Sequence, residues 1–146
     1  MKVRDIMRRA LVTILPDVSM QAAVEIMRAR EVRHLLVTDD GEQLLGVLTD
    51  RDLRHAAFLP MLARHLPWDA RRLGAPCVRD IMTCSVVTIG PEADLERAAL
   101  LMFERRVGSL PVTQDGRVVG ILTERDVFDT LRCEGEPRVL AELFLG

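Results

Sequence analysis

The chain has 146 residues, of which 49% are apolar, 29% are charged and only 3% are aromatic, with a net charge of −2. This length provides about one domain's worth of folded chain, and the scarcity of aromatic residues argues against a platform on which nucleic-acid bases stack. A net charge so close to zero creates no global field for a polyanion, so we expect no nucleic-acid partner.

The first predicted elements follow one another closely. The β-branched run LVTI at 11–14 ends before a proline and predicts a strand. Residues 19–30 carry apolar side chains at helical spacing and predict a helix. LLVT at 35–38 and LLGVL at 44–48 flank an Asp-Gly turn, which is typical of a β-hairpin. A further helix is expected to begin after Thr49.

The same order of elements then recurs. The segment VRDIM begins at Val3 and again at Val78, and nearly half of the positions that follow are identical between the two copies. Such a long period in two copies predicts a duplication with pseudo-twofold symmetry rather than a solenoid. The elements expected in the second copy are a strand at 86–89, a helix at 94–105, hairpin strands at 110–113 and 118–122, and a helix after Thr123.

Each copy is therefore a β-α-β-β-α unit, too small to cover both faces of its own sheet. We expect an α/β (α+β) fold in which two tandem units pack sheet to sheet with pseudo-twofold symmetry. The predicted parts are a first unit at 1–57, a docked linker at 58–77, a second unit at 78–132 and a C-terminal tail at 133–146. Apolar helical faces, linker and tail exceed the needs of one core, so we expect a homodimer.

The sequence contains no pattern of a signal peptide and no run of about 18 uninterrupted apolar residues. We therefore expect a cytoplasmic protein without direct membrane insertion. Cys77, Cys84 and Cys133 form no CxxC pair, and the histidines form no HExxH motif. Neither a disulfide framework nor a metal site is expected.

The two nearly identical stretches GVLTDRD and GILTERD have two interpretations. Each places a threonine three residues before an aspartate at a strand-to-helix junction, as Thr49 and Asp52 and again as Thr123 and Asp126. One interpretation is a capping box, in which the hydroxyl accepts a helix N–H and the carboxylate accepts the N–H of the threonine. Such boxes usually contain Glu or Gln in place of the aspartate.

The second interpretation is a nucleotide-binding site. A carboxylate such as Asp52 or Asp126 can accept hydrogen bonds from both hydroxyls of a ribose, and the free N–H groups of a helix N-terminus favour a phosphate. Arg51 and Arg125, which a capping box does not require, would add positive charge. The spacing alone leaves both interpretations open.

The repeated ensemble closely resembles the cystathionine-β-synthase (CBS) domain family. The shared pieces are VRDIM, a VTI strand followed by proline, the strand GSLPV and the pattern GxLTxRD. In that family, two motifs in tandem form a Bateman module. The resemblance covers nearly the whole chain.

In the family, the two motifs leave two clefts that bind adenosyl ligands, namely AMP, ADP, ATP and in some members S-adenosylmethionine or NAD. The resemblance implies a non-enzymatic sensor without a catalytic cofactor, which regulates a separate protein that the sequence does not identify. The candidate ligand-binding residues are Thr13, Ile14, Leu15, Arg33, His34, Leu35, Thr49, Arg51, Asp52, Thr88, Ile89, Gly90, Gly108, Ser109, Leu110, Pro111, Thr123, Arg125 and Asp126.

The two copies differ where the resemblance places the phosphate. The first copy has Arg33 and His34, whereas the second has Gly108 and Ser109, so we expect inequivalent clefts unless the basic pair is only a solvated strand end. The first copy also lacks the proline that the second has at Pro111. Two other functions stay open: a ligand-free dimerisation or adaptor module, and a redox responder that uses Cys77 or Cys84.

Overall fold

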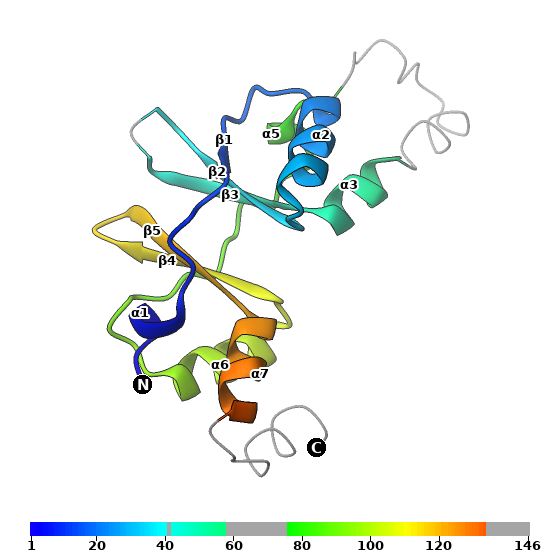
Figure 1. The fold of residues 1–146 in the computed structure, drawn as a ribbon. Coiled ribbons are helices and arrows are strands. Elements are labelled where there is room, and N and C mark those ends of the chain that lie inside the picture. The colour runs from blue at the N-terminus through cyan, green and yellow to red at the C-terminus, as the bar shows by residue number, and fades with distance from the viewer. Residues whose placement is uncertain (41, 58–75, 134–146) are drawn as a thin grey trace. The chain divides into compact units, whose positions relative to one another are not determined.

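The structure is a computed structural model that describes residues 1–40, 42–57 and 76–133 (Figure 1). The chain divides into two compact units. One consists of Met1–Leu11 and Val87–Gly146, and the other of Val12–Val86. Both combine helices with a small sheet, which confirms the expected α+β class. The predicted sheet-to-sheet packing of the repeats stays a prediction.

The unit Val12–Val86 contains a mixed sheet of strand order β1-β2-β3, in which β1 is parallel and β3 antiparallel to β2. Its elements are β1 (Thr13–Ile14), α2 (Met20–Arg30), β2 (His34–Thr38), β3 (Leu44–Thr49), α3 (Asp50–Ala57) and α5 (Val78–Ile81). The three helices lie together beside the sheet (Figure 1). Their apolar side chains and those of the strands form one buried core.

The unit of Met1–Leu11 and Val87–Gly146 contains the antiparallel pair β4-β5. Its elements are α1 (Val3–Ile6), α6 (Leu95–Arg105), β4 (Ser109–Gln114), β5 (Arg117–Thr123) and α7 (Glu124–Cys133). Buried side chains of all three helices and both strands form its core.

Both predicted hairpins, both helices at helical spacing and both helices after the Thr–Asp stretches are confirmed. Ser19 caps α2 by accepting the N–H of Ala22 at 3.1 Å, so the helix itself begins one residue later than predicted. The short helices α1 and α5 were not predicted. The predicted linker and C-terminal tail fall almost entirely outside the described residues.

The prediction of a strand at 86–89 is wrong, because only a single parallel bridge forms there, at Ile89. In the other unit the N–H of Leu36 donates to the carbonyl of Val12 at 3.1 Å and extends the pairing of β1 with β2. Pro111 occupies the corresponding position of the second repeat. Proline has no N–H to donate, so the parallel pairing cannot extend in the same way.

Residues 1–11 and 76–86, which contain the beginnings of the two repeats, are called here the leading segments. The first of them packs against elements of the second repeat: Val3 donates to the carbonyl of Ala93 at 2.9 Å, and Arg8 and Ile121 exchange backbone hydrogen bonds of 2.9 and 3.0 Å. Val3 belongs to the buried core of this unit. The first repeat therefore contributes its beginning to the unit that holds the second.

The second leading segment has the reciprocal arrangement. Val78 is fully buried in the core of the unit Val12–Val86, and its N–H donates to the carbonyl of Val18 at 2.8 Å. Thr83 and Val47 exchange backbone hydrogen bonds of 2.9 and 3.0 Å. The spatial units thus differ from the sequence repeats by an exchange of leading segments.

Charged side chains accompany both leading segments. Lys2 donates to Asp94 at 2.8 Å, and this pair raises the pKa of Lys2 and lowers the pKa of Asp94. The backbone N–H and the thiol of Cys77 donate to Asp80 and hold the pKa of that carboxyl below its usual value. Because these carboxyl pKa values are lowered in the folded protein, their stabilising contribution is present at neutral pH and is lost as the pH falls through the lowered values.

Two glycines allow the leading segments to cross the strands closely. A Cβ on Gly120 would lie 2.6 Å from Sδ of Met7, and a Cβ on Gly46 would lie 2.8 Å from the carbonyl oxygen of Thr83. Both distances are below 3.0 Å, which real Cβ atoms essentially never show. A larger residue at Gly46 would therefore push the leading segment away from its strand, whereas at Gly120 the side chain of Met7 would have to move first.

We expect Gly46→Ala to lower the free energy of unfolding by about 1–3 kcal/mol, since the added methyl group meets a backbone carbonyl that cannot rotate away. Thermal and urea denaturation would measure this loss. Gly90→Ala is the matched control, because a Cβ there would have nothing within 4 Å. Equal stability of the two variants would show that the close crossing is not required.

Candidate functional site

The Thr–Asp pairs form capping boxes at the starts of α3 and α7. The N–H of Asp52 donates to Oγ1 of Thr49 at 3.1 Å, and the N–H of Thr49 donates to Oδ2 of Asp52 at 2.9 Å. The corresponding distances for Asp126 and Thr123 are 3.3 and 3.1 Å. The predicted capping geometry is confirmed in both copies. We call these the Asp52 box and the Asp126 box.

The capping bonds do not exclude ligand binding by the same carboxylates. In both boxes the N–H of the threonine donates to only one oxygen of the aspartate, Oδ2. An ionised carboxylate has about four lone-pair positions, so Oδ1 is left for donors from outside the box. The box therefore fixes the orientation of a carboxylate whose second oxygen can point to a ligand.

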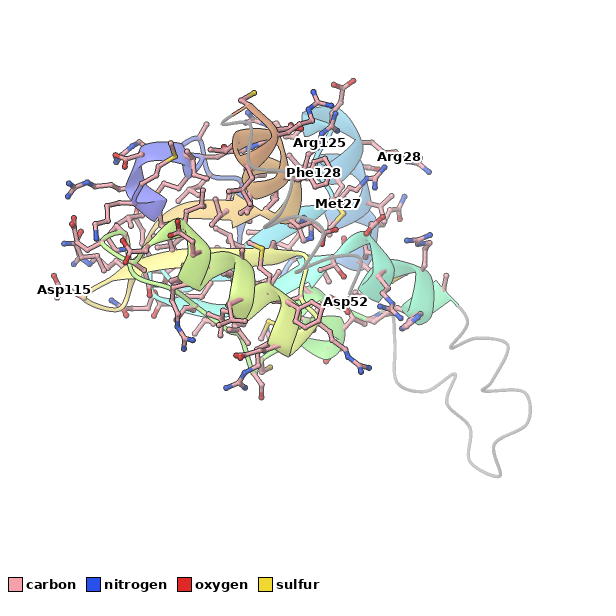
Figure 2. All side chains as sticks on the ribbon, turned by 90° about the horizontal axis from the view of Figure 1, so that it is seen from below. Met27, Arg28, Asp52, Asp115, Arg125 and Phe128 are labelled. Atoms are coloured by element: carbon pink, nitrogen blue, oxygen red, sulfur yellow. The ribbon has the colours of Figure 1, made fainter. Side chains whose placement is uncertain are left out.

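Arg33 and His34 lie beside the Asp52 box. The carbonyl of Arg33 accepts the N–H of Asp50 at 3.0 Å, and His34 is paired with Thr49 across β2 and β3. The structure thus brings together the basic residues and the aspartate that the sequence predicted as one site. Figure 2 shows Asp52 at the start of α3.

Gly108 and Ser109 hold the same positions beside the Asp126 box. The carbonyl of Gly108 accepts the N–H of Glu124 at 3.0 Å, and Ser109 is paired with Thr123 across β4 and β5. A Cβ on Gly108 would lie 3.7 Å from the carboxylate of Glu124. This box therefore has an acidic neighbour and lacks the basic pair of the other copy.

The remaining candidates separate by exposure. Leu35, Leu110 and Pro111 are fully buried, and the side chains of Leu35 and Leu110 belong to the two cores. In the two VTI segments the isoleucines are buried, whereas the flanking residues are exposed: Thr13, Leu15, Thr88 and Gly90. In these two segments the exposed positions are therefore the ones whose side chains are open to a ligand.

Arg51 and Arg125 are both exposed on the first turns of their helices. Nε of Arg125 lies 4.0 Å from Oδ2 of Asp129, one turn further along α7. Figure 2 shows Arg125 on the same helix as Phe128. In the part of the chain that the structure describes, neither arginine pairs with the aspartate of its box. Their predicted role in phosphate binding stays a prediction.

Arg8 was not among the sequence candidates, although it contacts one of the two boxes. Its Nε and Nη2 donate to Oδ1 of Asp126 at 3.1 and 3.0 Å. The side chain of Asp126 is only 14% exposed, whereas that of Arg8 is 60% exposed. The sequence contained one sign of this contact, namely that the two repeats differ at this position, with Arg8 in the first and Thr83 in the second.

Among the described residues, no group of three or more His, Cys, Asp or Glu could hold a metal ion. No described helix is both long enough and apolar enough to cross a membrane. One open hollow borders Gly108 and Glu124 and is otherwise lined by the end of α6 and the residues after it.

The family model of the CBS domain matches residues 3–58 and again residues 78–132. A CBS domain-containing protein of Dictyostelium discoideum is 35% identical over 130 residues, which cover 88% of this chain and 90% of the relative. An inosine-5'-monophosphate dehydrogenase of Methanocaldococcus jannaschii is 28% identical over 86% of this chain but only 23% of its own length. The chain therefore spans less than a quarter of that enzyme.

Solved structures show the same fold. The crystal structure of CBSX2 in complex with AMP has a TM-score of 0.75 and 32% identity, covering 91% of this chain and 98% of CBSX2. The cytosolic domain of the Mg²⁺ channel MgtE in complex with ATP has a TM-score of 0.70 and 28% identity, covering 89% of this chain and 48% of that one. Together with the two family matches, these likenesses show that the chain belongs to the CBS domain family, as a tandem pair of CBS domains.

Proposed function

We propose that this chain is a regulatory module that binds an adenosyl ligand of the AMP, ADP or ATP type and acts on a separate protein. The observation that carries the proposal is the repeated box, in which backbone and hydroxyl groups orient a carboxylate at a helix N-terminus. The similarity to CBSX2, which was solved with AMP, supports the choice of ligand class.

In this proposal each aspartate accepts hydrogen bonds from the ribose hydroxyls. The ligand's phosphate lies towards the end of the neighbouring strand, where Arg33 and His34 stand in the first repeat. The exposed edges of the VTI segments contact the adenine, as the resemblance implies. The boxes supply the orientation that two vicinal hydroxyls require, since both donors must point at one fixed carboxylate.

We assign the chain a binding role and no catalytic one. The relatives with enzymatic names are much longer, as the 23% coverage of the dehydrogenase illustrates, so their activities are not carried over. A bound ligand regulates when a coupled site differs in affinity or activity between the free and the bound state.

One observation favours a second candidate function, a ligand-free adaptor module. Both boxes make all the bonds of a capping box, which by itself explains the threonine and the aspartate. In that case the motif would stabilise helices α3 and α7 and bind nothing. Ligand-dependent stabilisation separates the two functions.

We expect AMP, ADP or ATP to raise the midpoint of thermal unfolding, because a ligand that binds only the folded state stabilises it by about 2.7 kcal/mol at a hundred times its Kd. Calorimetry against AMP, ADP, ATP, S-adenosylmethionine and NADH would rank the ligands. Inorganic phosphate is the control for unspecific anion binding. No heat and no thermal shift with any adenosyl compound would favour the adaptor.

We expect Asp52→Asn and Asp126→Asn to fold and yet each to lose binding at its own box by about tenfold or more, since a hydrogen bond to a charged group contributes about 1.5–3 kcal/mol. Titration calorimetry would measure the loss. Asp50→Asn is the matched control, because it removes the same charge from a carboxylate paired with Arg54. Variants that unfold at a lower temperature but bind the nucleotide like the wild type would show that the motif only caps the helices.

We also propose that the chain forms a homodimer. Phe103 is 52% exposed and Leu100 37% exposed on α6, and Phe128 is 43% exposed on α7. Exposed apolar residues on neighbouring helices of one unit favour burial in an interface.

We expect light scattering at tens of micromolar to give twice the chain mass of 16.4 kDa, and Phe103→Ser to shift the mass towards the monomer. Phe103→Leu, which keeps an apolar surface, is the control. A monomeric wild type, with and without AMP, would contradict the proposed dimer.

A further inference from the structure

We propose that Arg8 makes the Asp126 box selective for adenosyl ligands that carry a phosphate over the uncharged nucleoside. The inference rests on the proposed function, because it specifies the ligand class of one of its two sites. It concerns contacts within one compact unit, that of Met1–Leu11 and Val87–Gly146.

Both oxygens of Asp126 already have donors. Oδ2 accepts the N–H of Thr123 at 3.1 Å and its hydroxyl at 2.8 Å, while Oδ1 accepts Nε and Nη2 of Arg8 at 3.1 and 3.0 Å. A ribose that is to bind Asp126 must therefore replace one set of donors. The bond from the Thr123 backbone is fixed by the helix start, and the Thr123 hydroxyl is held in the box because it accepts the N–H of Asp126 at 3.3 Å. The exposed guanidinium of Arg8 is therefore the group that yields.

The contact of Arg8 is suited to such an exchange. Its side chain is 60% exposed, so the guanidinium can turn away into solvent or towards a ligand. Its backbone cannot leave, because Arg8 and Ile121 exchange two hydrogen bonds of 2.9 and 3.0 Å. The displaced guanidinium therefore stays within reach of the box.

A phosphate gives the displaced guanidinium a new partner. Arginine binds phosphate oxygens through the same parallel N–H donors with which it binds a carboxylate. AMP can thus exchange the Arg8–Asp126 pair for a ribose–Asp126 contact and an Arg8–phosphate contact. Adenosine also breaks the pair, but it gives Asp126 a new partner and leaves Arg8 without one. The carboxylate of Glu124 beside Gly108 increases the need for a cation, since it would otherwise repel a phosphate.

The other repeat provides the comparison. Thr83 is bonded to Val47 in the way that Arg8 is bonded to Ile121, but threonine cannot form an ion pair. Among the described residues no arginine contacts the carboxylate of Asp52, whose hydrogen bonds stay within its own box. The Arg8 mechanism is therefore specific to the Asp126 box.

The test is an NMR titration of the full chain with adenosine and with AMP. Amide signals of Thr123 and Asp126 report one box, and those of Thr49 and Asp52 report the other. The variant Arg8→Thr copies Thr83. Arg9→Thr is the matched control, because it removes the same charge from the next residue, whose guanidinium contacts only the carbonyl of Arg4 within the described residues, at 3.5 Å.

At the Asp126 box we expect the wild type to bind AMP about tenfold or more tightly than adenosine, and Arg8→Thr to lose most of that preference. Adenosine should bind Arg8→Thr at least as well as the wild type, because no ion pair has to break. Arg9→Thr should keep the wild-type preference. If Arg8→Thr does not fold, Arg8→Gln removes the charge while keeping most of the side chain, and the same loss is expected.

An unchanged preference in Arg8→Thr or Arg8→Gln would overturn the inference while leaving the adenosyl-binding function intact. An equal loss in Arg9→Thr would also overturn it, since the effect would then come from the general positive charge of the segment. If neither adenosine nor AMP shifts the signals of either box in the wild type, the proposed function fails and the inference fails with it.

Discussion

The leading segments cross strands β3 and β5 at glycines, and most of the local architecture depends on these two crossings. At Gly46 and Gly120 the absence of a Cβ allows the backbone of the segment to pair directly with the strand. The crossings bury Val3 and Val78 in the two cores. Each compact unit is therefore completed by the beginning of the other repeat, and neither repeat forms a complete unit from its own residues.

The same crossings determine which side chains reach the boxes. One residue of each leading segment is placed at the strand that ends in the box, Arg8 in one unit and Thr83 in the other. An arginine at this position reaches the carboxylate, as the contact with Asp126 shows. Duplicated backbones can thus carry chemically different sites, because a single side chain at a shared position changes the partners of a shared carboxylate.

The boxes themselves combine stability and binding capacity in one short motif. Helix-capping bonds orient the aspartate, and an oriented carboxylate loses less conformational freedom when a ligand binds. An aspartate is shorter than the glutamate that most capping boxes contain, and in both copies it still reaches the backbone N–H of the threonine. The structural and the functional interpretation of the motif therefore do not exclude each other, since Oδ2 makes the capping bond and leaves Oδ1 for groups outside the box.

The sequence by itself determined the repeat, the hairpins, the main helices and the capping boxes, because periodicity, turn residues and capping patterns act between residues close together in the chain. It also indicated the CBS family. It also predicted a strand at 86–89, which does not form. Pro111 has no N–H to donate to this segment, and the two lie some twenty residues apart, so the local pattern at 86–89 does not show the loss. Only the tertiary structure decided the exchange of leading segments and the contact of Arg8 with Asp126. These two residues are 118 positions apart, and no local pattern specifies which distant carboxylate a given arginine will meet.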